Sequence, residues 1–518
     1  MRRITHGSTS TPSDKTTEQV LEELGNVVDQ YHFPIATKAV EHPPFTYMFG
    51  DLAENKACLI PQTSETLEHL SNLGAAMRDT DFDPTFDSEI PSAYTYLAQL
   101  VNHDINFTDV KKDNGDTDFQ FLASADLAPW DDGKIMERVS NKRGGMLELD
   151  CVYGRMQADV LPPREKDNHD KMALGTVSPS GDRPPGTAKD DFHDVVRGER
   201  SETFKLDRTA LIGDRRNDSN LIVSQLQVAF LRAHNAIIDA KKCSYEEAKQ
   251  FLVKHYHWLI RHDFLPWIVP EKIIEKVESD PLYNTKQGLP YEFSVGAFRF
   301  GHCMVRRNYY YNDNFRGVNL SFLATVVALS KGGFKPTPNE GPSNLPENRI
   351  MQWENFLNGP GNKARALRTE MVEPLFELLD EVNIDVPGER SLAVQDLKRS
   401  YLMRIPTGQV IAEQLKVDRL TPADLETFST PEQFKVLKEA NMLECTPLSF
   451  YVLAEAKKAG NGKLGEVGGR IVAEVLIGLL RDRDDSIIGT NFTPDRDLSK
   501  QGTFFLSDLL KLAGVFAD

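Results

Sequence analysis

The stretch LAQLVNHDINFTDV, residues 97–110, carries several polar side chains within an otherwise apolar, helical pattern. At 3.6 residues per turn, Gln99, Asn102 and His103 share one face of the expected helix, because they are three and four residues apart. Asp104 points about 100° away from His103. A single histidine on a helix face is usually a hydrogen-bonded core residue, so its role depends on what the rest of the chain supplies.

Length and charge limit the class of protein. The chain has 518 residues, enough for two to four domains or for one large helical enzyme with a continuous core. Its 77 acidic and 60 basic residues give a formal charge of −17. A negative field repels nucleic acids and anionic membrane surfaces. We therefore expect a small-molecule substrate and no nucleic-acid partner.

The N-terminus and the cysteines predict a cytoplasmic, reduced protein. MRRITHGSTSTPSDKT contains two arginines but no apolar stretch behind them, so it lacks the hydrophobic region of a secretory signal. No window approaches the run of about 20 apolar residues that a membrane span needs. The five cysteines are odd in number and are not arranged in metal-binding pairs.

Helical signals dominate, and strand-like alternation is scarce. Ser244 and Glu247 stand at capping-box spacing before a long segment with apolar residues at helical intervals. Thr421 before Pro422, and Thr430 before Pro431 with Gln433 three residues on, predict two more helix starts. The segment IVAEVLIGLL, from Ile471, is apolar nearly all round, which predicts a buried helix.

Two polar, proline-rich segments interrupt the helical pattern, at about residues 160–200 and 331–348. We interpret both as long surface loops, because the motifs of one site lie on either side of them. No internal repeat is visible. The expected organisation is an N-terminal extension over residues 1–39, partly flexible, followed by one domain over residues 40–515.

Five segments together carry a resemblance to a known family. LAQLVNHDINFT is similar to the distal-helix motif of the animal-type haem peroxidases, the peroxidase–cyclooxygenase superfamily. Four more segments follow in the family's order, namely GDRRNDSNLIV (213–223), GAFRFGHCMV (296–305), LAVQDLKRSYLMRIPTGQ (392–409) and GGRIVAEVLIGLL (468–480). The resemblance, to a bacterial-type member, implies a mainly α fold. In that fold, one large helical domain with long irregular loops holds haem between a distal helix near 97–110 and a proximal helix near 294–306.

The resemblance implies catalytic roles for His103, Arg216 and Gln99. Cleavage of hydrogen peroxide needs a base that takes a proton from one oxygen and delivers it to the departing one, and an imidazole with an ordinary pKa of about 6.5 suits this task. The permanently charged Arg216 would stabilise the departing hydroxide. Gln99, one turn before His103, would orient peroxide or a distal water by hydrogen bonding.

On the opposite side of the haem, the resemblance makes His302 the axial ligand of the iron. It makes Arg299 and Arg399 partners of the haem propionates, and Asp396 the acceptor of the proximal histidine's second nitrogen. Mammalian members usually have asparagine at that last position. A carboxylate there increases the basicity of the ligand, so the proximal imidazole is expected to be more anionic than in those relatives.

A calcium site is also implied. In the family, the aspartate after the distal histidine binds calcium together with a short loop, which GGMLELDCVYG, from Gly144, resembles. Asp104, Glu148 and Asp150 would supply carboxylates, and Gly144 and Met146 backbone carbonyls, which suits the oxygen-rich shell of calcium. The loop departs from the family pattern, because Gly144 replaces a usual threonine and Glu148 a usual aspartate.

The attachment of haem is expected to differ from that in mammalian relatives. Those proteins form esters from an aspartate just before the distal histidine and a glutamate three residues after the distal arginine. Here the two positions are Asn102 and Ser219, which lack the necessary carboxylate, and the position of an occasional sulfonium-forming methionine is Asn220. We therefore predict noncovalently bound haem b, unless the neighbouring Asp218 substitutes.

The resemblance implies a peroxidase that reduces hydrogen peroxide through a ferryl intermediate and oxidises a small-molecule donor, in a setting such as the response to oxidative stress. One alternative is a fatty-acid dioxygenase or cyclooxygenase-like enzyme. Such relatives need a radical-forming tyrosine three residues before the proximal histidine, where this chain has Arg299. Tyr309, Tyr310 and Tyr311 would lie about two helical turns past His302 and are poor substitutes.

A second alternative is a catalytically impaired haem-binding protein. Such a protein has no reason to keep both distal partners, yet His103 and Arg216 are present together with Gln99. The missing ester residues suggest a lower redox potential, which would favour phenolic or similar donors over halides. The sequence determines neither the donor nor the oligomeric state.

Overall fold

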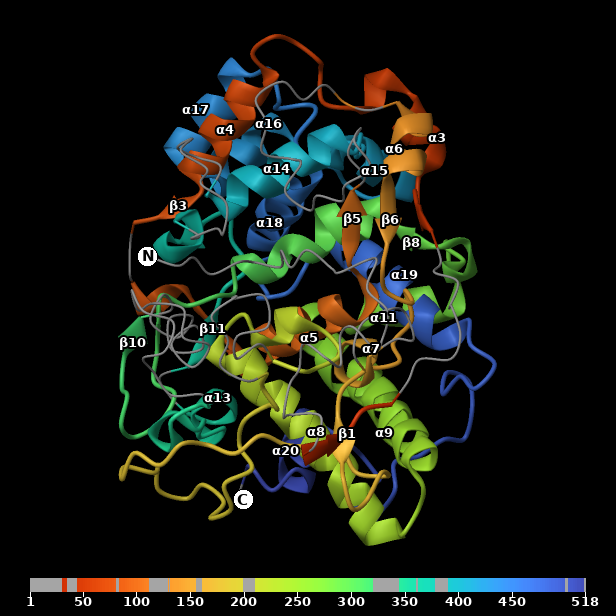
Figure 1. Ribbon diagram of the computed structural model, residues 1–518. Coiled ribbons are helices and arrows are strands. Elements are labelled where there is room, and N and C mark those ends of the chain that lie inside the picture. The colour runs from red at the N-terminus through yellow and green to blue at the C-terminus, as the bar shows by residue number, and fades with distance from the viewer. Residues whose placement is uncertain are drawn as a thin grey trace.

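The computed structural model shows a mainly α protein with a few short strands (Figure 1). It describes residues 30–34, 44–80, 83–110, 129, 131–154, 161–198, 210–319, 344–359, 362–377, 390–498 and 502–516. The predicted domain boundary at residue 40 and most of the predicted loop over 331–348 lie outside the described residues.

One group of helices surrounds α5 (Ala93–Ile105), which lies in the middle of the molecule (Figure 1). Helix α5 packs against the long α8 (Leu221–Lys241), the 3-10 turn η4 (Arg215–Asp218) and the short α7 (Asp150–Tyr153). Helices α9 (Tyr245–Leu259) and α20 (Leu506–Leu512) pack against other parts of α8.

A second group contains the segment predicted as the proximal helix. This segment is a π-helix, η7 (Glu292–Gly296), followed by a 3-10 helix, η8 (Ala297–His302). It packs against α14 (Leu392–Leu402), α18 (Leu448–Ala459) and α19 (Glu466–Arg481). The two groups meet where α5 contacts η8, so segments about 200 residues apart in sequence border one region.

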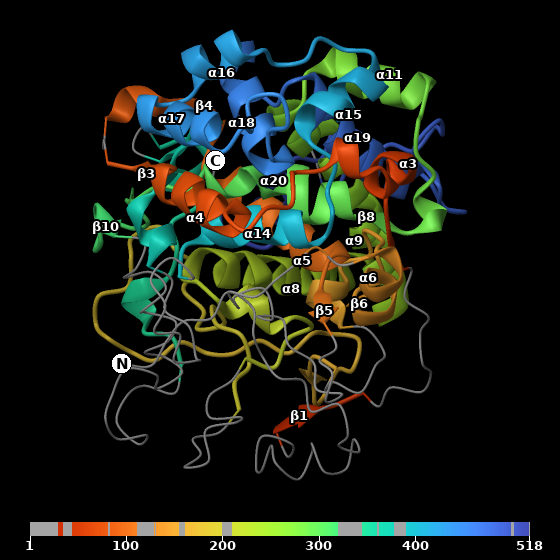
Figure 2. The same cartoon turned by 90° about the horizontal axis from the view of Figure 1, so that it is seen from above.

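The remaining helices cover these two groups. Helix α4 (Thr66–Ala76) packs on α14, and α17 (Pro431–Glu439) packs on α4, as Figure 2 shows from above. Helix α16 (Pro422–Phe428) packs on α18, and α11 (Glu271–Ser279) packs on α19. Shorter helices complete the shell: α3 (Gly50–Glu54), η1 (Lys56–Cys58), η2 (Pro84–Phe86), α6 (Asp132–Arg138), η5 (Ile260–Phe264), α10 (Leu265–Ile268), η6 (Thr285–Gln287), η9 (Glu347–Arg349), α13 (Glu354–Leu357), η10 (Glu373–Phe376) and α15 (Gly408–Leu415).

The strands form two-stranded pairs that tie distant segments together. The antiparallel pairs are β1 (Tyr31–His32) with β7 (Arg164–Glu165), β4 (Asp87–Pro91) with β11 (Lys363–Arg365), β5 (Thr108–Val110) with β6 (Val139–Asn141), and β9 (Asn308–Tyr309) with β10 (Val318–Asn319). The parallel pairs are β2 (Phe45–Thr46) with β8 (Leu289–Pro290), and β3 (Arg78–Asp79) with β12 (Met371–Val372).

The predicted helix starts are confirmed. Ser244, Thr421 and Thr430 are each an N-cap residue in a complete capping box, whose side chains satisfy backbone N–H groups that the first helical turn leaves open. The predicted buried helix is also confirmed, since the residues from Ile471 to Leu480 in α19 are all buried.

Two helix boundaries differ from the prediction. The distal helix ends at Ile105 and not near residue 110, because the Asn141 side chain donates to the Ile105 carbonyl at 2.8 Å and accepts the Phe107 N–H at 2.9 Å. These bonds stop the helix and start strand β5. The proximal segment leaves α geometry at Gly296, which has φ −112° and ψ −95°. Glycine is required there, because the side chain of Leu448 would be 2.8 Å from an added Cβ.

The prediction of a surface loop near residues 160–200 is only partly correct. The described part, 161–198, contains no helix, but residues 193–198 are buried. The Arg197 guanidinium donates to Asp194 at 2.8 and 2.9 Å and to Asp218 at 2.9 and 3.1 Å, so these buried charges compensate one another. A proline-rich composition therefore did not reveal that residues 193–198 are part of the interior.

One helix in the described part of the chain is long and apolar enough to cross a membrane. This is α8, and 89% of its most apolar window is buried inside the protein. The five cysteines are free thiols.

Candidate active site

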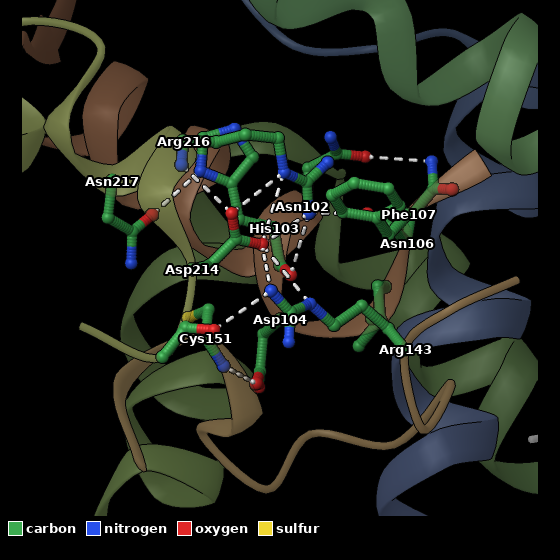
Figure 3. Close-up of polar contacts among 12 residues, drawn as sticks. Asn102, His103, Asp104, Asn106, Phe107, Arg143, Cys151, Asp214, Arg216 and Asn217 are labelled. Carbon is green, nitrogen blue, oxygen red and sulfur yellow. Dashed lines mark hydrogen bonds and ion pairs between the residues drawn. The ribbon is translucent and has the colours of Figure 1, made fainter. Parts of the chain in front are cut away.

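The first half of the site is built around His103 on α5 (Figure 3). Its imidazole is buried, with 3% exposed, and its Nδ1 lies 2.7 Å from Oδ1 of Asn217 in η4. Arg216, the residue before Asn217, uses Nη2 to donate to the backbone carbonyls of His103 at 3.1 Å and of Asn106 at 2.9 Å. The predicted base and the predicted distal arginine are therefore in direct contact, although 113 residues separate them in sequence.

Asp214 holds this arginine in place. Its carboxylate accepts from Nε of Arg216 at 3.1 Å and from Nη2 at 2.6 Å, and from Nε of Arg143 at 3.1 Å (Figure 3). Burial alone would raise the pKa of Asp214, but the two guanidinium groups hold that pKa well below its usual range. Asp214 is therefore an anion that fixes Arg216 against the end of α5.

The surroundings keep the imidazole of His103 neutral. Burial, reinforced by the charge of Arg216, lowers the pKa of His103 to about 3, although Asp214 acts in the opposite direction. An imidazole that is uncharged at neutral pH can accept a proton, which is the first requirement for a base.

Gln99 points toward the start of α8. Its Oε1 accepts from Nδ2 of Asn220 at 3.2 Å, and its Nε2 lies 3.5 Å from Oγ of Ser219. Oδ1 of Asn102 accepts from Asn106 at 3.3 Å. The positions of the family's ester residues therefore carry neutral side chains: Asn102 hydrogen-bonds within α5, and Ser219 contacts Gln99.

Asp218 is engaged elsewhere. The side chain is fully buried, and its carboxylate accepts from both terminal nitrogens of Arg197 and, at 3.1 Å, from Oγ of Ser224. Using this carboxylate for an ester would leave the buried Arg197 with one carboxylate partner fewer. Asp218 is thus a poor substitute for the missing ester residues.

The second half of the site is built around His302, the last residue of η8. Its Nδ1 lies 2.7 Å from Oδ2 of Asp396 on α14, so this predicted pair is brought together. Burial would raise the pKa of Asp396, but His302, Arg299 and Arg399 together lower it. Asp396 is an ionised carboxylate at neutral pH. Because it contacts Nδ1, Nε2 is the nitrogen with which His302 could bind a metal.

The two predicted propionate arginines lie beside this pair. Nε of Arg299 is 3.8 Å from Oδ1 of Asp396, and neither of these buried atoms has a hydrogen-bond partner among the described residues. Burial and the charge of Arg216 lower the pKa of Arg299. Burial and the charge of Arg299 lower the pKa of Arg399 to about 10. Two buried guanidinium groups that repel each other favour a ligand with carboxylates of its own, as haem has. The residues present therefore fit haem.

The predicted calcium ligands are only partly assembled. The buried Asp104 accepts the N–H group of Leu149 at 3.0 Å and that of Cys151 at 3.3 Å, and Figure 3 shows Asp104 and Cys151 side by side. Burial raises the pKa of Asp104, and the nearby Asp150 raises it further. Glu148 instead faces Arg483, 3.4 Å away.

No group of three or more His, Cys, Asp or Glu side chains that could hold a metal occurs among the residues that the structure describes. The Glu148 carboxylate is paired with Arg483. No role is derived for calcium, and the site formed by Asp104, Glu148, Asp150, Gly144 and Met146 stays a prediction.

Sequence reasoning missed three residues of the distal half, namely Asn217, Asp214 and Arg143. The first two stand next to Arg215 and Arg216 in DRRND, where only their proximity to the distal arginine could have signalled a role. Arg143 precedes the predicted calcium loop, and nothing in its local sequence indicates a contact with a residue 71 positions later.

Comparison with known families agrees with this arrangement. The family model described as animal haem peroxidase matches residues 108–373, about half of the chain. The chain belongs to this family. Arg216, Arg299 and His302 lie within the matched residues, whereas His103 and Asp396 lie outside them. Membership makes the protein an oxidoreductase of the haem peroxidase superfamily that binds haem.

Solved structures show the same fold at low sequence identity. Peroxidase A from Dictyostelium discoideum has a TM-score of 0.57 and 16% identity, over 100% of this chain and 99% of its own. The fatty acid alpha-dioxygenase of Oryza sativa has a TM-score of 0.53 and 13% identity, over 97% of this chain and 89% of its own. The Arabidopsis thaliana fatty acid alpha-dioxygenase has a TM-score of 0.50 and 13% identity, over 96% of this chain and 84% of its own. No curated protein sequence matches the chain.

Proposed function

We propose that the protein is a haem peroxidase that reduces hydrogen peroxide and oxidises a small-molecule donor. The position of Arg216 carries this proposal. Its guanidinium donates to the backbone carbonyl of His103 and is near enough to the neutral imidazole to lower its pKa, so a permanent positive charge and a neutral base lie together, as heterolytic cleavage of peroxide requires.

In this proposal, Nε2 of His103 takes a proton from hydrogen peroxide and returns it to the departing oxygen. Arg216 stabilises the negative charge of the departing hydroxide. Asp214 prevents the guanidinium from turning away, since it accepts from two of its nitrogens. Gln99, on α5, orients peroxide or water.

On the other side, His302 is the proposed axial ligand, and Arg299 and Arg399 the proposed propionate partners. Bound haem would supply an iron centre that takes oxidising equivalents from peroxide and passes them to the donor. Asp396 keeps the proton on Nδ1 of His302 and raises the electron density of the ligand. With Asn102 and Ser219 at the ester positions, we propose haem b without covalent attachment.

The dioxygenase alternative is less favoured. Among the structural neighbours are both a peroxidase and fatty acid dioxygenases, and fold alone does not distinguish them. Arg299 occupies the position at which the dioxygenase-like relatives need a tyrosine. Tyr309, moreover, lies in strand β9 and not on a continued proximal helix.

The deciding experiment is an absorption spectrum of the purified, haem-loaded protein, followed by hydrogen peroxide or a fatty acid without peroxide in a stopped-flow instrument. We expect a Soret band that changes with peroxide and recovers on addition of a phenolic donor. A halide should be oxidised more slowly than the phenol. Oxygen uptake with the fatty acid alone would favour the dioxygenase, and a protein without a Soret band would contradict both. Acid extraction should release the haem.

A further inference from the structure

Asn217 has a place in the distal half that the peroxidase assignment does not explain. It lies in η4 next to Arg216, its side chain is fully buried, and Figure 3 shows it directed at the imidazole of His103. The heavy-atom distance of 2.7 Å between its Oδ1 and Nδ1 of His103 is short for a hydrogen bond to nitrogen.

A second buried amide is the partner of the other end of Asn217. Nδ2 of Asn217 donates to Oε1 of Gln227, 2.8 Å away on α8, and Gln227 is fully buried as well. Since one end of an amide donates and the other accepts, this bond turns the oxygen of Asn217 toward His103. An oxygen acceptor requires a proton on Nδ1, so the unprotonated nitrogen of the neutral ring is Nε2.

The backbone that carries Asn217 is held by the ion pairs already described. The Asn217 N–H donates to the Asp214 carbonyl at 2.9 Å, and the Asp214 side chain is bonded by Arg143 and Arg216. The amide is therefore fixed by η4 on one side and by α8 on the other.

We propose that Asn217, oriented by Gln227, is a positioning residue that holds His103 in the tautomer with its proton on Nδ1. The proposal deepens the proposed peroxidase function and rests on it for its consequence: Nε2, the nitrogen that meets peroxide, is kept ready to accept a proton. A ring with the opposite tautomer would present an N–H there and could not act as the base.

The test is a nitrogen-15 NMR measurement of histidine tautomers in the full-length protein. Any bound haem is replaced by diamagnetic zinc protoporphyrin IX, and the His103 signals are assigned by their absence in His103→Gln. We expect one neutral tautomer, protonated on Nδ1, in the native protein and in Asn217→Asp, which keeps the acceptor oxygen. Asn217→Leu, which removes it, should give a mixture or the opposite tautomer.

A rate measurement on the haem-loaded variants complements the spectra. The rate constant for reaction with peroxide should fall roughly 10- to 100-fold in Asn217→Leu at unchanged haem loading. Asn312→Leu, which removes another fully buried asparagine, is the control and should leave the His103 tautomer unchanged.

Three results would overturn the proposal. One is a native His103 with its proton on Nε2, which corresponds to an Asn217 amide turned the other way. The second is an Asn217→Leu variant with an unchanged tautomer. The third applies if Asn217→Leu does not fold. In that case, an Asn217→Asp protein in which His103 is no longer protonated on Nδ1 would overturn the proposal. Failure of the peroxidase function itself would appear separately, as a native protein with the predicted tautomer but no reaction with peroxide.

Discussion

The two halves of the site use the same kind of contact with opposite electrical character. His103 and His302 each have Nδ1 2.7 Å from a side-chain oxygen, but the first oxygen belongs to the amide of Asn217 and the second to the carboxylate of Asp396. A neutral acceptor fixes the ring without adding charge, whereas a carboxylate makes the ring more basic. The difference teaches that the hydrogen-bond partner on Nδ1 determines the role of each imidazole. The amide suits His103 to transferring protons, and the carboxylate suits His302 to binding a metal.

The largest effect is expected from removal of the proximal ring. His302→Ala should lose nitrogen ligation of the iron, so the Soret band should shift or disappear, and added imidazole should restore it in part. His69→Ala changes a half-buried histidine on α4 and serves as the control. A normal, unchanged spectrum in His302→Ala would place the axial ligand elsewhere.

On the distal side, Arg216→Ala should lower the rate constant for reaction with peroxide by roughly 10²- to 10³-fold, since one preorganised electrostatic contact to a developing anion is lost. Stopped-flow absorption measures this at equal haem content. Arg215→Ala, next to it in η4, should stay within a few-fold of the native protein. Equal losses in the two variants would mean that η4 is disturbed as a whole and that the guanidinium has no special role.

Glu292, a second buried carboxyl group in the proximal segment, can be compared with Asp396. Glu292 in η7 accepts the N–H groups of Met48 and Phe49, both at 2.9 Å, and burial raises its pKa from 4.5 to about 7, because amides compensate its charge less well than the arginines compensate Asp396. A raised carboxyl pKa means that the folded state binds more protons than the unfolded state between about pH 4.5 and 7. Stability should therefore fall as pH rises through that window.

Glu292→Gln removes this titration. The free energy of unfolding of the native protein, relative to the variant, should fall by about 3 kcal/mol from pH 4.5 to pH 7. Urea unfolding at a series of pH values measures the difference, with Glu275→Gln on the exposed face of α11 as the control. A difference that is constant with pH, or that grows as pH rises, would show that Glu292 is ionised throughout.

The smallest expected effect concerns the proximal carboxylate. Asp396→Asn should keep the hydrogen bond to His302 but remove its charge, so the reduction potential should rise by about 50 mV, the equivalent of about 1 kcal/mol for one electron. Spectroelectrochemical titration measures it, and the exposed Asp418→Asn is the control. An unchanged or lower reduction potential would contradict the proposal that the charge of Asp396 makes His302 electronically different from His103.

Sequence motifs predicted the mainly α fold, the helix caps and the pairing of His302 with Asp396, because these depend on local spacing or on a shared family pattern. They did not predict the end of α5, since it depends on Asn141, or the irregular proximal segment, where Leu448 packs against Gly296; both residues approach from distant parts of the chain. The same reason explains why Asn217 was missed. Its function depends on meeting His103 and Gln227, which no local pattern encodes.

The central claim is that His103 acts as the proton acceptor for peroxide, and its most direct test is the rate constant of haem-loaded His103→Ala with hydrogen peroxide. We predict a fall of roughly 10²- to 10⁴-fold, the usual contribution of a general acid–base group, while the Soret band before mixing is that of the native protein. A variant with the native spectrum and the native rate would contradict the account.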